Sequence, residues 1–154
     1  MVNFTRRYMF VVGAACLLKP AKVAAAERPS VTVHRDPECG CCLGWVRHIQ
    51  KSGFVTDLRE TKDLDSIKKR LRIPADLAAC HTAEIAGYVI EGHVPAAALN
   101  RLLTEKPKAI GIAVPGMPVG SPGMEGGEPE RYEVVLFGLN ERRVFMRFVG
   151  TKKI

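Results

Sequence analysis

Hydrophobic and polar positions along the chain follow two periods, which together predict alternating strands and helices. Residues 30–34 alternate with the two-residue period of a strand and are rich in β-branched side chains, and residues 54–60 predict a second strand. Between them, residues 43–51 repeat apolar side chains every three or four positions, which predicts a helix that ends near Gly53. Residues 64–71 have the same helical period, so the first half of the chain predicts strand, helix, strand, helix.

The second half of the chain predicts three more strands and one more helix. A strand is expected at residues 86–91, a helix at residues 96–103, and two final strands at residues 132–137 and 144–149. Residues 107–129 contain many glycines and prolines and predict a long irregular loop of the kind that often carries function. This order of elements is typical of an α/β protein.

Three cysteines, Cys39, Cys41 and Cys42, lie between the first predicted strand and the first predicted helix. A helix N-terminus carries unpaired N–H groups and partial positive charge, which lower the pKa of nearby thiols and make them better metal ligands and nucleophiles. Three thiolates this close repel one another, so they need a cation between them or a disulfide between two of them. Purely structural bridging is the weaker interpretation, because the adjacent Cys41 and Cys42 cannot easily bridge each other.

The position of these cysteines also predicts the fold. A cysteine cluster after the first strand and at the start of the first helix suggests a thioredoxin-like sandwich. We therefore expect an α/β fold in which helices flank a mixed sheet, with a long loop rich in glycine, proline and methionine.

Further candidate ligands occur downstream. Cys80 and His81 precede the predicted strand at residues 86–91, on a loop that would face the start of the first helix in this fold. Cys80 is alternatively a buried small residue or a disulfide partner, and His81 is a ligand or a group that supports one. Met117 and Met124 lie in the glycine- and proline-rich loop, where they are interpreted as thioether ligands or part of a lid, and alternatively as plugs for apolar gaps.

The other histidines and the single tryptophan are interpreted mainly as structural residues and not as metal ligands. His34 and His93 are interpreted as ordinary polar residues, although His34 is near enough to the cysteines to be a peripheral ligand. His48 is expected to face solvent. Trp45 is expected in the core, where it shields the cysteine cluster.

Charge and composition point to an exported protein and argue against nucleic acid as a partner. The 154-residue chain has a formal net charge of +7, but four of its 23 basic residues and none of its 16 acidic ones lie in residues 1–26. That segment has the basic start, short apolar run and small-residue site of a secretory signal. We expect a signal peptide at residues 1–26 and one domain at residues 27–154, in a bacterial periplasm. A membrane anchor, or lipidation at Cys16, is the weaker alternative, and the export route (Sec or twin-arginine) stays open.

The ligand types favour copper over the other metals that cysteines bind. Structural zinc usually takes two C-x-x-C pairs, and an iron–sulfur cluster is less common in an oxidising compartment. Copper is a soft metal that bacteria handle outside the cytoplasm. Crowded thiolates with nearby thioethers can bridge several Cu(I) ions, so a polynuclear site is expected.

Three motifs together resemble the periplasmic CopG-like copper-resistance proteins, the domain-of-unknown-function 411 family. They are the C-G-C-C run at residues 39–42 that precedes Trp45, the Cys-His pair at residues 80–81, and the tract from Ala-Val-Pro-Gly-Met-Pro to Ser-Pro-Gly-Met-Glu at residues 113–125. The resemblance covers roughly residues 31–149 and implies a thioredoxin-like fold, copper binding at the cysteine cluster and a place in copper handling. Carried over by position, it implies Cys39, Cys41, Cys42 and Cys80 as core ligands, with Met117 and Met124 as accessory candidates.

The leading hypothesis is a periplasmic copper-binding protein that holds Cu(I) in copper resistance. It would sequester the ion, pass it to a copper-export or copper-oxidase component, or change its oxidation state. We expect a metal-binding protein with copper redox activity rather than a conventional enzyme. It is not expected to stay inserted in the membrane after signal cleavage.

The alternative hypothesis is a periplasmic thiol–disulfide oxidoreductase that uses Cys39 and Cys42, with a third cysteine resolving. Thioredoxin-like enzymes place a cis-proline before the third strand, whereas residues 80–87 contain no proline. That difference favours metal capture over disulfide exchange. A third interpretation is a small interaction domain held together by disulfides.

Overall fold

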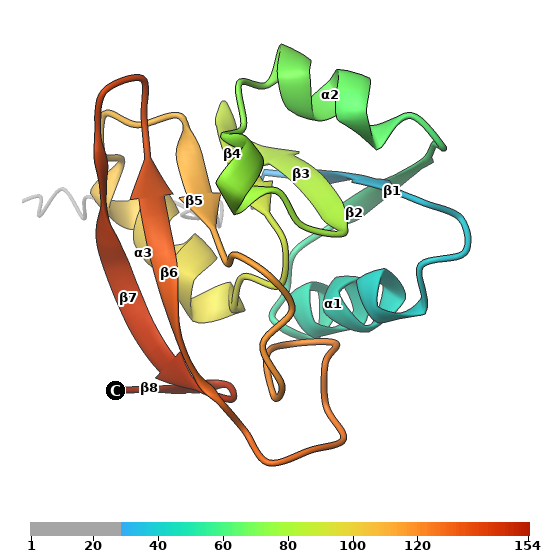
Figure 1. The fold of residues 1–154 in the computed structure, drawn as a ribbon, viewed down its shortest axis with the longest axis vertical. Coiled ribbons are helices and arrows are strands. Elements are labelled where there is room, and N and C mark those ends of the chain that lie inside the picture. The colour runs from blue at the N-terminus through green and yellow to red at the C-terminus, as the bar shows by residue number, and fades with distance from the viewer. Residues whose placement is uncertain (1–28) are drawn as a thin grey trace, which may run out of the picture.

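The computed structural model describes residues 29–154, so the predicted signal peptide at residues 1–26 lies outside the described residues. Strands and helices alternate in the first part of the chain, and strands dominate the last part (Figure 1). The elements are β1 (Val31–Arg35), α1 (Gly40–Lys51), β2 (Thr56–Glu60), α2 (Leu64–Arg70), a 3₁₀ turn (Ala75–Leu77), β3 (His81–Ile85), β4 (Tyr88–Glu91), α3 (Ala96–Glu105), β5 (Gly111–Ala113), β6 (Arg131–Phe137), β7 (Arg142–Val149) and β8 (Lys152–Lys153).

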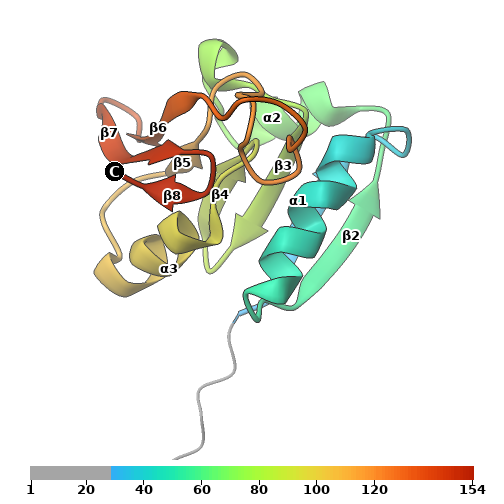
Figure 2. The ribbon, with the colours of Figure 1, turned by 90° about the horizontal axis from the view of Figure 1, so that it is seen from below.

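All the described strands belong to one mixed sheet with the order β2-β1-β3-β4-β5-β6-β7-β8. The β1–β2 and β4–β5 pairs are parallel, and the other neighbours are antiparallel. Helices α1 and α3 cover one face of the sheet, and α2 covers the other (Figure 2). The expected α/β architecture, with helices flanking a mixed sheet, is therefore present.

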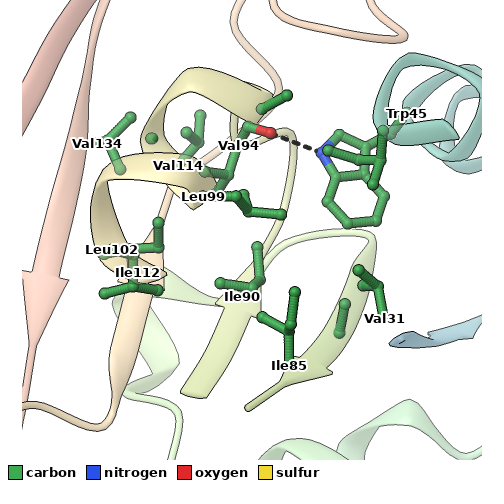
Figure 3. Close-up of a cluster of buried hydrophobic side chains, with 14 of the residues drawn as sticks. Val31, Trp45, Ile85, Ile90, Val94, Leu99, Leu102, Ile112, Val114 and Val134 are labelled. Carbon is green, nitrogen blue, oxygen red and sulfur yellow. Dashed lines mark hydrogen bonds between the residues drawn. The ribbon is translucent and has the colours of Figure 1, made fainter. Parts of the chain in front are cut away.

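The main hydrophobic core lies between the sheet and helices α1 and α3 (Figure 3). Trp45 from α1 is fully buried there, and its indole N–H donates a hydrogen bond to the carbonyl of Val94 at 2.8 Å. Leu99 and Leu102 from α3 are also fully buried. Because a buried indole N–H needs an acceptor, this bond fixes α1 against the segment between β4 and α3.

The strand predicted at residues 86–91 is only partly correct. Residues 81–91 form a hairpin of two strands, β3 and β4, joined at Ala86 and Gly87, which have φ angles of 49° and 83°. Two successive residues with positive φ are typical of a tight hairpin turn. The pattern concealed this turn because β3 has buried side chains on both of its faces, so it lacks the alternation of a half-exposed strand.

Two short strands were also missed. Strand β5 lies inside the tract predicted as a loop, and its Gly111 packs so closely on β4 that an added Cβ would lie 1.9 Å from the carbonyl oxygen of Val89. Strand β8 has only two residues, too few for a periodic signal. Within residues 29–154, no helix has the length and apolar character needed to span a membrane.

Candidate metal centre

The first three cysteines lie at the N-terminus of α1, which begins at Gly40, three residues earlier than predicted. Cys39 is the N-cap residue in an extended conformation, and Cys41 and Cys42 lie in the first turn. Residues three apart at a helix start can face the same side, and here Cys39 and Cys42 form a disulfide while Cys41 stays a free thiol. The Sγ atoms of Cys39 and Cys41 are 3.5 Å apart.

A buried arginine at the end of β1 holds the turn that presents Cys39. Arg35 is 3% exposed, and its guanidinium donates to the carbonyls of Pro37 at 2.7 Å and Cys39 at 3.3 Å. It also forms an ion pair with Glu60 on β2 at 2.7 Å. Because a guanidinium has its donors in a rigid planar fork, these contacts fix the turn relative to the sheet.

Cys80 reaches the cluster from the segment between the 3₁₀ turn and β3. Its Sγ atom lies 3.9 Å from Sγ of Cys41, and Sγ of Cys42 lies 3.7 Å from its carbonyl oxygen. The four Sγ atoms of Cys39, Cys41, Cys42 and Cys80 all lie within 4.8 Å of one another. The structure therefore brings together the cysteines that the sequence predicted as core ligands.

Two histidines also contact Cys80. Its Sγ atom is 3.0 Å from Nε2 of His93 and 3.4 Å from Nδ1 of His81. Nδ1 of His93 lies 2.7 Å from the carbonyl oxygen of Pro122, which can only accept, so Nδ1 carries the proton and Nε2 turns its lone pair toward Cys80. Nε2 of His81 is buried and has no hydrogen-bond partner.

Burial controls the protonation of these groups. It raises the pKa of the Cys80 thiol to about 12, with further contributions from the charge of Cys41 and a hydrogen bond with it. Burial also lowers the pKa of His81 well below its usual value, and His93 and Lys68 add to this effect. The pKa of His93 is lowered for the same reason, burial. Neutral histidines beside a protonated thiol form a site that a soft cation can enter by displacing a proton.

Comparisons with known proteins identify the family of this chain. The family model "Protein of unknown function, DUF411" matches residues 77–124. Two solved structures, "Copper resistance protein copG- Form 1" and "Form 2", are each 41% identical to this chain, with a TM-score of 0.75. They cover 80% and 79% of this chain, and 100% and 99% of their own length. The chain belongs to the CopG-like DUF411 family. No curated protein matches the chain.

In this CopG-like chain, the loop predicted to carry ligands packs over the start of α1. Gly123 lies so close that an added Cβ would be 2.5 Å from the carbonyl oxygen of Cys41 and 2.6 Å from the backbone nitrogen of Trp45. The next residue, Met124, is half-buried, whereas Met117 is 52% exposed. The loop therefore packs on the cysteine-bearing turn at Gly123.

The structure changes the interpretation of two histidines, His93 and His48, and agrees with that of His34 as an ordinary polar residue. His93 is interpreted from the sequence as an ordinary polar residue, but its Nε2 lies 3.0 Å from Sγ of Cys80. His48 was expected to face solvent; instead it is half-buried, and its Nε2 accepts a hydrogen bond from the Ala96 N–H at 3.0 Å. His34 pairs with Glu84 at 3.0 Å, and it is not one of the residues whose ligand atoms lie within 4.8 Å of the cysteine sulfurs as one cluster.

The sequence contained a signal that places His93 beside Cys80, but the signal can be used only when the β3–β4 hairpin is recognised. The β3–β4 register pairs Thr82 with Glu91, and continuing it by two residues places Cys80 opposite His93. Recognition of Ala86-Gly87 as a tight turn would have given this register. Reading residues 86–91 as one strand hid the pairing.

Proposed function

We propose that the protein captures Cu(I) in the periplasm as part of copper resistance, with the thiolates of Cys39, Cys41, Cys42 and Cys80 as ligands. The observation that carries the proposal is the convergence of four sulfur atoms within 4.8 Å. Thiolates are soft ligands that select Cu(I). The two similar structures are of copper resistance proteins, which supports the choice of metal.

Capture by all four sulfurs requires the reduced protein, because Cys39 and Cys42 form a disulfide. Two electrons and two protons from a dithiol donor convert that disulfide into two thiols, and the donor is oxidised to a disulfide. Four thiolates in one partly buried space carry more negative charge than one Cu(I) ion can balance. Bridging thiolates would therefore hold several ions in a polynuclear cluster.

Histidines and methionines complete the proposed site. His81 and His93 add nitrogen ligands beside Cys80, since both rings are buried and neutral. Met124 and Met117 are accessory thioether ligands on the loop, and the packing of Gly123 against α1 supports its sequence neighbour Met124.

We also classify the first part of the domain as thioredoxin-like. The order β2-β1-β3-β4, with β1 and β2 parallel and β3 antiparallel to both of its neighbours, supports this classification. We propose that residues 1–26 are a signal peptide and that the domain at residues 27–154 works in the periplasm. There it would sequester Cu(I) or pass it to a copper-export or copper-oxidase component.

A competition titration tests copper capture. The reduced protein should withdraw Cu(I) from a chromogenic Cu(I) chelator, and Cys80→Ser should weaken the affinity by at least about tenfold because one of the core thiolates is lost. Ala97→Ser, an exposed position on α3, is the matched control and should bind like the unmodified protein. Failure of the reduced protein to compete with the chelator would overturn the proposal.

A second candidate function is thiol–disulfide exchange, which the Cys39–Cys42 disulfide at the start of α1 favours. In this activity a dithiol donor, which becomes a disulfide, would reduce the Cys39–Cys42 pair, and the two thiols would then pass two electrons and two protons to a substrate disulfide. The described residues contain no cis peptide bond, so the cis-proline of thioredoxin-like enzymes is not found there. Insulin reduction by metal-free protein separates the two functions, and no turnover would remove this one.

A further inference from the structure

A buried polar cluster joins β3, β4 and α2 next to Cys80. Glu91 and Thr82 are fully buried, and the Lys68 side chain is 11% exposed. Nζ of Lys68 lies 2.5 Å from one carboxylate oxygen of Glu91 and 2.8 Å from the Thr82 hydroxyl. Because Lys68 comes from α2, the cluster lies on the face of the sheet opposite the one that α1 and α3 cover (Figure 2).

The Glu91 carboxylate holds the chain on both sides of Cys80. One oxygen accepts the Ala79 N–H at 2.6 Å, and the other accepts the Thr82 hydroxyl at 2.6 Å. Ala79 immediately precedes Cys80, and Thr82 follows it by two residues. A single rigid carboxylate therefore spans the residue that supplies the fourth sulfur.

The residue after Glu91 reinforces this arrangement. Gly92 has a φ of 71°, and an added Cβ there would lie 2.8 Å from the Ala79 Cβ. Its N–H donates to the carbonyl of His81 at 3.1 Å. The end of β4 thus presses closely against the segment that carries Cys80.

Fold stability alone gives a weak reason for a charged pair in this position. Replacing a buried ion pair by apolar residues of similar volume is often neutral or stabilising, because desolvation of the two charges costs as much as their attraction returns. The carboxylate does provide something that an apolar side chain cannot, namely two directed acceptors for Ala79 and Thr82.

We propose that Glu91 is a positioning residue for copper capture, acting through the backbone on either side of Cys80. Its two hydrogen bonds hold the Cys80 sulfur 3.9 Å from that of Cys41 and 3.0 Å from Nε2 of His93. The inference rests on the proposed Cu(I) site. Lys68 balances the charge of Glu91, so the clamp itself consists of the Glu91 carboxylate and the two groups that donate to it, the Ala79 N–H and the Thr82 hydroxyl.

A matched pair of variants isolates the hydrogen bonds from the charge. Lys68→Met with Glu91→Gln keeps an acceptor for Ala79 and a donor for the Thr82 oxygen, and it leaves no buried charge. The double variant Lys68→Met with Glu91→Leu has the same charge and a similar volume, but it lacks the hydrogen bonds to Ala79 and Thr82. The Leu variant should bind Cu(I) about tenfold more weakly than the Gln variant. Loss of a hydrogen bond that supports a ligand lowers metal affinity by about tenfold or more.

A Cys80→Ser background tells positioning apart from a general effect on the fold. There, the Gln and Leu variants should bind Cu(I) equally, because Glu91 acts through Cys80. Equal binding with Cys80 present, or a difference that persists without it, would overturn the inference. If the Leu variant does not fold, Thr82→Val removes one arm of the clamp and should weaken binding by about threefold to tenfold, whereas no change would overturn the inference.

A copper-free measurement distinguishes failure of the clamp from failure of the proposed function. In a Cys41→Ser background with the disulfide intact, Cys80 is the one free thiol among residues 29–154. Its alkylation by iodoacetamide should be about tenfold faster in the Leu variant than in the Gln variant, because local opening exposes the thiol. If the unmodified protein fails to bind Cu(I) but this difference is found, the proposed function fails and the clamp stands; equal rates would overturn the clamp.

Discussion

Nε2 of His93 lies 3.0 Å from Sγ of Cys80, and the opposite ring nitrogen bonds the carbonyl of Pro122. One histidine thus connects a proposed thiolate ligand to the loop that covers the site. His93→Gln should weaken Cu(I) affinity by about tenfold, since it removes both a nitrogen ligand and its orienting bond. His34→Gln is the matched control, because His34 pairs with Glu84 instead. Equal affinities of the two variants in a chelator competition would contradict the role of His93.

The contact between α1 and the covering loop is testable with two glycines of the same helix. A Cβ at Gly44 would lie 2.7 Å from the Cα of Gly123, whereas a Cβ at Gly40 meets nothing within 4 Å. Gly44→Ala should therefore lower the free energy of unfolding by about 1–3 kcal/mol, the usual cost of overpacking. Gly40→Ala should leave it equal or slightly higher, because alanine favours helix. Urea unfolding measures both, and equal stabilities would show that the loop does not pack on Gly44.

Acid should destabilise the fold. Burial lowers the pKa of His48, His81 and His93, so below their ordinary value of 6.5 the unfolded chain binds more protons than the folded one. The stability that these neutral rings contribute is present above pH 6.5 and is lost as the pH falls toward their folded pKa values. For the fully buried His81 the slope approaches about 1.4 kcal/mol per pH unit.

Denaturant unfolding at pH 7.5 and pH 5.5 measures this loss. His81→Phe keeps a planar ring without a titrating nitrogen, so its stability should fall less over the same interval. A variant that loses as much stability as the unmodified protein would show that protonation of His81 does not cause the effect.

Copper affinity should rise with pH. The Cys80 thiol, with a pKa of about 12, stays protonated at neutral pH in the metal-free reduced protein, so Cu(I) must displace its proton. Each displaced proton makes the apparent affinity rise tenfold per pH unit below the thiol pKa. The value of log Kd therefore falls as the pH rises, and Cys80→Ser should make this fall shallower by about one log unit per pH unit. An unchanged slope would mean that Cys80 does not give up a proton to the metal.

Local sequence signals located the helices and half of the site. The helical period of residues 43–51 predicted most of α1. The period of residues 64–71 predicted α2, which Asp63 caps by accepting the Ser66 N–H at 3.1 Å. The close spacing of Cys39, Cys41 and Cys42 indicated their shared chemistry, because neighbours on one helix turn are brought together by local geometry alone. The resemblance to CopG-like proteins, made on short motifs, is confirmed.

Tertiary pairing decided the rest. Cys80 reaches Cys41 across 39 residues, and His93 reaches Cys80 across 13, because the β3–β4 hairpin and the β1–β3 pair fix a register. The buried Lys68–Glu91 pair gave no periodic signal, since its partners come from a helix and a strand on either side of Cys80. The sequence by itself determined which soft ligands exist and where the helix that carries three of them begins to within a turn. Only the folded sheet decided which histidines join them, because strand register is set by long-range packing and not by neighbours in the chain.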